Sequence, residues 1–245
     1  MKVLSEKTIK CWSFVEALLA PVFSALLCPM LVHASDSSPA KEANDHLVPV
    51  VEYLGWAQQY RTLWREKLFV TPGEVARFVH LPAFTDLEIA MSVYKSKGMT
   101  GSLAGDYWVT VTEPSAPLSK CIPSVNVEHP VDPKTIQIRR TDAPLPESTA
   151  LTVKKLWAAM LRQKAPENSG ATAVDSSTEL FSGAGASGRV IEAQLPADAK
   201  ENSLALVKVA NSLINYASAP ASERPRLARE IEMEGKRLLT RVSRQ

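Results

Sequence analysis

Proline sets the strongest constraint on what the middle of this chain can fold into. Seven prolines lie between residues 114 and 146, at positions 114, 117, 123, 130, 133, 144 and 146. Proline has no backbone N–H and its ring clashes with the preceding helical turn, so this segment excludes an α-helix, and within a sheet proline is confined to an edge. We therefore expect irregular arms around one short strand, residues 135–139, that runs along a sheet edge.

Before the prolines, the hydrophobic pattern is typical of β-strands. Three short runs have strand-like composition, over residues 74–81, 87–94 and 106–112, and the second and third alternate apolar and polar positions. These runs predict an antiparallel meander. Their half-polar faces suit a sheet that is covered on one side only.

Helical periodicity marks most of the remaining segments. Four helices are expected, over residues 53–64, 147–163 and 199–217 and from a cap at Ser222 to the end of the chain. The first should bury its aromatic stripe and turn Arg61 and Arg65 toward solvent. The connection between the last two is short, which favours an antiparallel αα-hairpin packed on the sheet. A second β-hairpin is expected from residues 178–181 and 189–195.

These elements predict an α+β fold. An antiparallel sheet, formed by the meander and the second hairpin, should be covered on one face by three to four helices, including the C-terminal αα-hairpin. The composition, 45% hydrophobic and 22% charged, is ordinary for a folded protein. The net charge of +2 provides no field that would favour nucleic acid or an anionic membrane as the main partner.

The first 34 residues are typical of a secretory signal peptide. Lys2, Lys7 and Lys10 precede an apolar run over residues 17–32, and small or compact residues at the end of the segment predict cleavage after Ala34. This indicates a bacterial-type protein of the periplasm or the extracellular space. The alternative is an uncleaved N-terminal anchor, but the uninterrupted apolar run is shorter than the roughly 20 residues that a spanning helix needs.

The rest of the chain divides into a lead-in and one domain. Residues 35–46 are polar and without periodicity, so we expect them to be flexible, and residues 47–245 should form a single α+β domain. After cleavage Cys121 is the one remaining cysteine, which excludes an internal disulfide. The stability of the domain must then come from its core.

A glycine-rich stretch offers the most specific motif match. Residues 183–188, GAGASG, fit the G-x-G-x-x-G pattern of dinucleotide sites. Such a site needs a helix directly after the third glycine, to place its N-terminus at the pyrophosphate. Residues 189–195 have the pattern of a strand instead. We therefore interpret the stretch as a hairpin loop and expect no cofactor.

Three side chains are the first suspects for catalysis, Cys121, His129 and His80. A thiolate nucleophile needs a base, and His129 follows Cys121 by eight residues, but no orienting group stands at a meaningful spacing. Metal-site spacings such as H-E-x-x-H or C-x-x-C do not occur, so no metal site is expected. The missing signatures favour a protein that is not an enzyme.

Aromatic residues in the meander point to a binding role. Tyr94, Tyr107 and Trp108 flank one loop, and the prolines should leave a sheet edge partly unpaired. The predicted function is therefore an exported accessory or protein-binding module whose partner is a protein of the cell envelope, without nucleic-acid contact and without a membrane anchor once the signal is removed. The alternative is a cell-envelope hydrolase with a site assembled from scattered residues.

Overall fold

The computed structural model describes residues 45–50, 55–69, 74–82, 86–96, 106–123, 129–163, 177–185 and 189–244. The predicted signal peptide, and the lead-in up to residue 44, lie outside the described residues. Within these ranges, no helix combines the length and the apolar character needed to cross a membrane. All of them belong to one compact unit, residues 42–245.

A single antiparallel sheet organises the domain. Its seven strands are β1 (Val48–Pro49), β2 (Glu74–Leu81), β3 (Ile89–Lys95), β4 (Tyr107–Pro114), β5 (Ile138–Leu145), β6 (Thr178–Ala184) and β7 (Val190–Gln194). They are arranged in the order β1-β7-β6-β2-β3-β4-β5, and every neighbouring pair is antiparallel. The predicted meander is β2-β3-β4, and the predicted second hairpin is β6-β7. The α+β prediction is confirmed.

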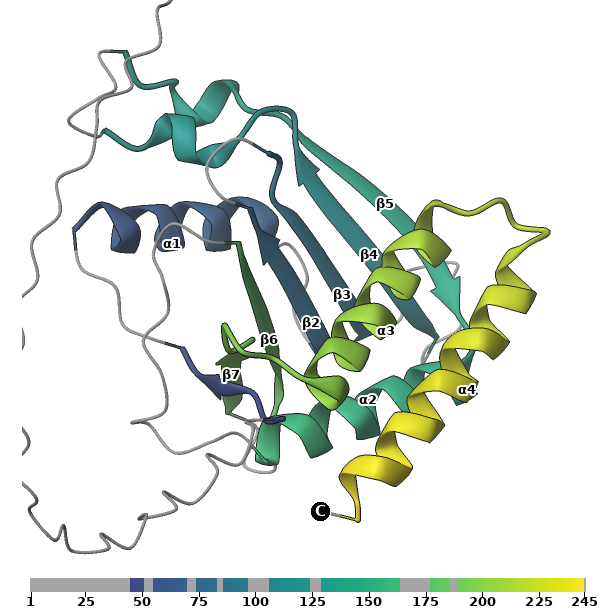
Figure 1. Ribbon diagram of the computed structural model, residues 1–245. Coiled ribbons are helices and arrows are strands. Elements are labelled where there is room, and N and C mark those ends of the chain that lie inside the picture. Colours follow the sequence, from purple (N-terminus) through teal and green to yellow (C-terminus); the bar gives the residue numbers. More distant parts are fainter. Residues whose placement is uncertain are drawn as a thin grey trace, which may run out of the picture. The chain divides into compact units, whose positions relative to one another are not determined.

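Three of the four helices cover one face of the sheet in two layers. The four helices are α1 (Trp56–Leu68), α2 (Glu147–Arg162), α3 (Glu201–Ser218) and α4 (Arg224–Val242). α2 packs over β2, β6 and β7, and α3 packs over β3, β4 and β5. α4 lies outside them and packs against both, so the predicted αα-hairpin contacts the sheet mainly through α3 (Figure 1). α4 is not capped by Ser222, since its N-cap is Glu223 and no side chain caps it.

The proline-rich segment holds the edge position that the sequence predicts, but with different boundaries. Its strand, β5, spans Ile138–Leu145 rather than residues 135–139, and Thr135 is instead the last residue of a short 3-10 turn, η2 (Pro133–Thr135). A second 3-10 turn, η1 (Leu118–Cys121), lies between β4 and β5. Pro144 fits inside β5 because it occupies a position whose backbone nitrogen does not bond to β4, so proline removes no bond of the ladder.

The main core lies between the sheet and the α2 to α4 layer. Phe78 and Phe181 face each other across β2 and β6 with ring centroids 5.2 Å apart, and Trp157 of α2 lies 5.9 Å from Phe181. The Trp157 indole Nε1 donates a 3.0 Å hydrogen bond to the carbonyl oxygen of Arg77. This buried aromatic group joins α2 to two strands and satisfies its one polar atom.

The described chain is anchored at its start by a carboxylate. Asp45 Oδ1 accepts hydrogen bonds from the backbone N–H groups of Asn202, at 2.6 Å, and Ser203, at 3.3 Å. These are first-turn amides of α3, which have no partner within their own helix. Asp45 and His46 fall inside the predicted flexible lead-in, so described structure begins two residues before the predicted domain start at residue 47.

α1 packs on the opposite face of the sheet, across one end of the strands. Gly55 adopts φ 65°, a left-handed conformation that glycine tolerates, and the helix therefore begins at Trp56 rather than at residue 53. A second apolar cluster lies beneath it, formed mainly by Leu63, Trp64, Leu68, Val79, Ala90, Leu118, Cys121, Ile122, Ile136 and Leu180. We call this side of the sheet the α1 face.

A buried carboxylate joins α1 to the turn η1. Glu88 is 1% exposed, and its Oε1 accepts a 2.6 Å hydrogen bond from the Tyr60 hydroxyl of α1. The N–H of Leu118 donates to both carboxylate oxygens, at 3.0 and 3.1 Å. Burial, and then the charge of Glu88, raise the pKa of Tyr60 far above its ordinary value. The phenol therefore stays protonated and acts as a donor.

Replacing Tyr60 by phenylalanine should destabilise the domain. The variant leaves the buried Glu88 carboxylate without one of its donors, and we expect the free energy of unfolding to fall by about 1–3 kcal/mol in chemical denaturation. Tyr94→Phe is the matched control, because the Tyr94 hydroxyl accepts a single 3.5 Å contact from Arg140. Equal losses in the two variants would contradict the structural role of the Glu88 junction.

Candidate functional site

Strand register places six polar side chains in one row across the α1 face. Cross-strand pairing joins Glu192 to Ser182, Ser182 to Arg77, Arg77 to Ser92, Ser92 to Thr110 and Thr110 to Asp142. The row crosses β7, β6, β2, β3, β4 and β5. It lies one row further from α1 than Val79, Ala90 and Leu180, on which the helix packs. We call it the polar row.

The next row along the strands is aromatic. Tyr94 of β3 pairs with Trp108 of β4, and Trp108 pairs with Pro144 of the edge strand β5. Both aromatic side chains are half-buried, while Pro144 is exposed. The structure therefore brings together two of the three predicted partner-binding residues. We call Tyr94, Trp108 and Pro144 the aromatic row.

Tyr107 is separated from the other two aromatic residues by the pleat of the sheet. Successive side chains of a strand point to opposite faces. Tyr107 therefore joins the core beneath the helices, where it is 6% exposed, and the Lys95 ammonium lies 5.6 Å from its ring centroid. A partner that contacts Trp108 on the α1 face cannot contact the Tyr107 ring on the same surface.

Ion pairs close both ends of the polar row. Arg61 and Arg65 of α1 both donate to Oε2 of Glu192, the former at 2.8 Å. The prediction that these arginines point to solvent is thus wrong, because the carboxylate of β7 attracts them onto the sheet. At the other end, Arg140 Nε contacts both oxygens of Asp142, at 3.0 and 2.9 Å, and the Thr110 hydroxyl donates to Asp142.

The centre of the row is a partly buried ion pair. Arg77 contacts Glu74, which also accepts a 3.0 Å hydrogen bond from the Ser92 hydroxyl. An extra residue in β2 between Glu74 and Ala76 turns Glu74 onto this face, next to Tyr94. The Arg77 guanidinium carbon stacks 3.3 Å from the Phe69 ring centroid. Burial raises the pKa of Glu74 despite the opposing charge of Arg77.

The arginines of this face also affect one another. Burial lowers the pKa of Arg65, and the charges of Arg61 and Arg77 lower it further, against the attraction of Glu192. Three guanidinium groups therefore share two carboxylates, Glu192 and Glu74. The arrangement fastens α1 to β7 and fills the space beside the aromatic row with paired charge.

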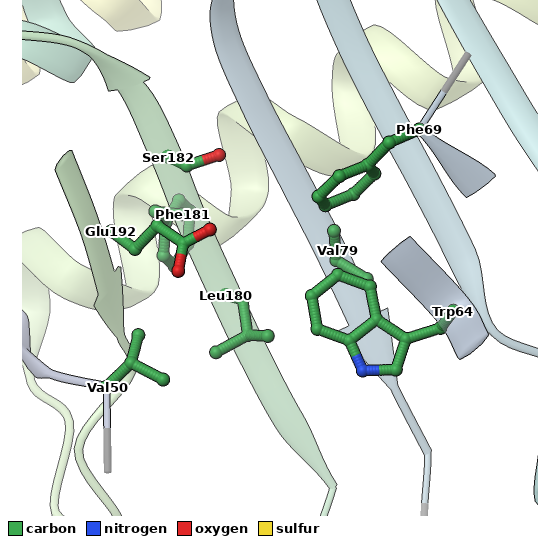
Figure 2. Close-up of a pocket in the computed structure, with 8 residues that line it drawn as sticks. All are labelled: Val50, Trp64, Phe69, Val79, Leu180, Phe181, Ser182 and Glu192. Atoms are coloured by element: carbon green, nitrogen blue, oxygen red, sulfur yellow. The ribbon is translucent and has the colours of Figure 1, made fainter. Parts of the chain in front are cut away.

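The cavity beneath α1 is too small for a substrate. Its volume is about 10 Å³, and its lining includes Trp64 and Phe69 on one side and Val50, Leu180 and Glu192 on the other (Figure 2). The Trp64 and Phe69 rings close it, with centroids 5.1 Å apart. A space of this size holds about one water molecule.

A larger groove lies on the helical side, between α3 and α4. Its volume is about 570 Å³, and it is lined by Lys200, Glu201, Leu204, Ala205, Lys208, Glu234 and Arg241. Most of these side chains are charged and exposed. Neither this groove nor the cavity under α1 is lined by a residue that the sequence singles out for catalysis.

The three catalytic suspects do not all lie on one side of the sheet. Cys121 lies in η1, 6% exposed, within the apolar cluster of the α1 face, whereas His80 of β2 lies on the opposite face, 3.2 Å from Glu179. His129 is exposed beyond η1. Burial raises the pKa of the Cys121 thiol, and the charge of Glu88 raises it further. Among the described residues, no group of three His, Cys, Asp or Glu side chains could hold a metal ion.

Comparison with known proteins gives no relative from which a function could be transferred. No family model, no curated protein and no solved structure matches the chain. The interpretation of the α1 face therefore rests on its own geometry.

The sequence does not predict the polar row, although it does predict which face of their strands two of its residues share. The alternation of β3 and β4 already groups Ser92 with Tyr94, and Thr110 with Trp108. Arg77, Ser182 and Glu192 join them only through pairing with strands that are distant in the sequence. No local pattern reports that pairing.

The thiol of Cys121 should be unreactive in the folded protein. Its burial and raised pKa both disfavour the thiolate, so a thiol-specific reagent at neutral pH should modify it slowly, and rapidly once denaturant exposes it. Labelling is followed over time, and peptide mass spectrometry locates the modified residue. If folded protein were labelled at Cys121 as fast as the unfolded chain, the thiol would be activated and the hydrolase alternative would regain its nucleophile.

Proposed function

We propose that this chain is an exported, non-catalytic module that binds a protein of the cell envelope through the aromatic row of its α1 face. The observation that carries the proposal is the cross-strand pairing of Tyr94 and Trp108 on a part of the sheet beyond the rows on which α1 packs. Both rings are half-buried, so each is held by its neighbours and presents its remaining surface.

The chemistry of this surface suits a protein partner. Tyrosine and tryptophan are enriched at interfaces, where they supply large contact areas at a small cost in side-chain entropy. Pro144 continues the row to the edge of the sheet, and the half-exposed charges of Arg140 and Asp142 flank it. An apolar centre with a polar rim is the usual composition of a protein interface.

Neither of the two cavities found in the described part of the chain has the character of a hydrolase site. A hydrolase site needs a concave space in which catalytic groups converge. The cavity under α1 has room for about one water, and the groove between α3 and α4 is lined mainly by lysine, arginine and glutamate side chains. Cys121 and His80 lie on opposite sides of the sheet. We therefore retain binding as the function.

The aromatic row can be tested by removing its largest side chain. Trp108→Ala should weaken binding of an envelope partner by about tenfold or more, because buried tryptophans commonly act as hot spots. The partner is first isolated from a cell-envelope extract on immobilised wild-type protein, and its affinity is then measured by titration.

The control variant is Met233→Ala, which removes an apolar side chain that is 54% exposed on α4, away from the α1 face. This variant should keep wild-type affinity. The proposal fails if Trp108→Ala, folded by circular dichroism, binds as tightly as wild type, or if nothing is retained by the wild-type protein.

The export part of the proposal rests on the N-terminal sequence. Lys2, Lys7 and Lys10 followed by the apolar run of residues 17–32 support a signal peptide that is cleaved after Ala34. Protein recovered from the periplasm or the medium should therefore begin at Ser35 in N-terminal sequencing. A chain that still begins at Met1 and stays with the membrane fraction would instead establish the uncleaved anchor.

A further inference from the structure

The edge strand β5 has a regular set of unpaired backbone groups. In the described part of the chain β5 pairs with β4 alone. The N–H of Ser115 donates to the carbonyl oxygen of Gln137 at 2.8 Å, next to the pair formed by Pro114 and Ile138. Because bonded and non-bonded pairs alternate along an antiparallel ladder, the odd-numbered residues of β5 bond to β4. The even-numbered residues direct their N–H and C=O groups away from the sheet.

Two further observations agree that the even-numbered residues of β5 direct their backbone groups away from β4. Pro144 is even-numbered and has no N–H to contribute, and its carbonyl oxygen accepts a 2.5 Å hydrogen bond from the Tyr216 hydroxyl of α3. The backbone groups of Ile138, Arg140 and Asp142 have no such partner among the described residues. The open part of this edge, from Ile138 to Asp142, is a template for another strand.

The charges on this edge are self-complementary. Arg140 and Asp142 lie two residues apart on the α1 face and pair with each other, with side chains 39% and 36% exposed. If a second β5 lies antiparallel to the first with Thr141 opposite Thr141, Arg140 of each copy faces Asp142 of the other. Arg139 then faces Ala143 on the opposite side of the sheet. Opposite charges and a threonine pair directly across two strands are stabilising.

The same charges select the register. A shift of the second strand in one direction brings Arg140 opposite Arg140, and a shift in the other direction brings Asp142 opposite Asp142. Like charges directly opposite each other are destabilising. Charged side chains on an edge strand act against association where like charges meet. On the α1 face this edge carries one charge of each sign, Arg140 and Asp142, and only one register places each opposite the other.

We propose that a second copy of this chain pairs with β5, joining the two seven-stranded sheets into one across a twofold axis at Thr141. In this arrangement each Arg140 and Asp142 pair lies at a bonded position and exchanges both of its backbone hydrogen bonds. The twofold axis stands perpendicular to the sheet, so the interface is closed and the α1 faces of the two copies lie on the same side. The dimer rests on the β5 edge and does not depend on the proposed function.

Charge reversal tests the dimer. The protein recovered from cells should be a dimer by light scattering coupled to size-exclusion chromatography. Arg140→Asp places two aspartates opposite each other, and Asp142→Arg places two arginines opposite each other, so each variant should raise the dimer dissociation constant by about tenfold or more. An equimolar mixture of the two variants should dimerise again, because each reversed charge then faces its opposite.

The mixture also excludes misfolding as the cause of a lost dimer, since an unfolded variant would not dimerise with its counterpart. Arg237→Asp is the matched control, because Arg237 is an exposed arginine of α4, outside β5, and its reversal should leave the dimer intact. A monomeric wild-type protein overturns the proposal, as does a dimer that neither reversal weakens. The dimer is measured without a binding partner, and Trp108→Ala, which leaves Arg140 and Asp142 unchanged, tests binding separately, so failure of the dimer and failure of the binding function are distinguishable.

Discussion

The pleat of the sheet determines on which face of the sheet each strand side chain lies. Along each strand, alternate residues enter the core beneath the helices or lie on the α1 face. Phe78, Met91 and Phe181 fix this alternation, since a slip of one residue would move them to the α1 face and turn the polar row into the apolar core. Burial of a large apolar side chain is worth about 1.5–3 kcal/mol, so the correct register is strongly preferred.

Carboxylates then determine which part of the α1 face stays accessible. Glu88 and Glu192 both accept hydrogen bonds from α1, through Tyr60 in one case and through Arg61 and Arg65 in the other. A helix that is held from two directions in this way lies across one end of the strands. The aromatic row is left beyond it, at the end of the sheet where Pro144 reaches the edge. The positions of two glutamates thus define the surface that we assign to binding.

The β5 edge and the α1 face suit different kinds of partner. The face offers tyrosine and tryptophan rings whose surroundings are filled with paired charge, which suits a folded protein surface. The edge offers backbone groups in a fixed register, which suits another strand, and its two opposite charges are satisfied by a copy of itself. If both are used, two aromatic rows lie on the same side of one continuous sheet, and a partner with two sites could bind both at once.

The local elements and their order follow from patterns in the amino-acid sequence. Alternation predicted β3 and β4, helical periodicity predicted α2 and α3 to within two residues, and the prolines predicted that β5 lies at an edge. Each of these depends on neighbours that are close in the chain. The boundaries of β5 and the start of α1 were predicted less well, because the first depends on pairing with β4 and the second on the left-handed conformation of Gly55.

Tertiary structure decided which of these residues meet. Tyr107 and Trp108 are adjacent in the sequence and are separated by the sheet, whereas Glu192 and Asp142 lie in one row although 50 positions separate them. Arg61 and Arg65 have the spacing of a solvated helix face, yet they bind a carboxylate of β7 that no local pattern could supply. Cross-strand pairing and helix docking are contacts between segments that are distant in the sequence. The periodicity of one segment indicates its own secondary structure but not which other segment it will contact.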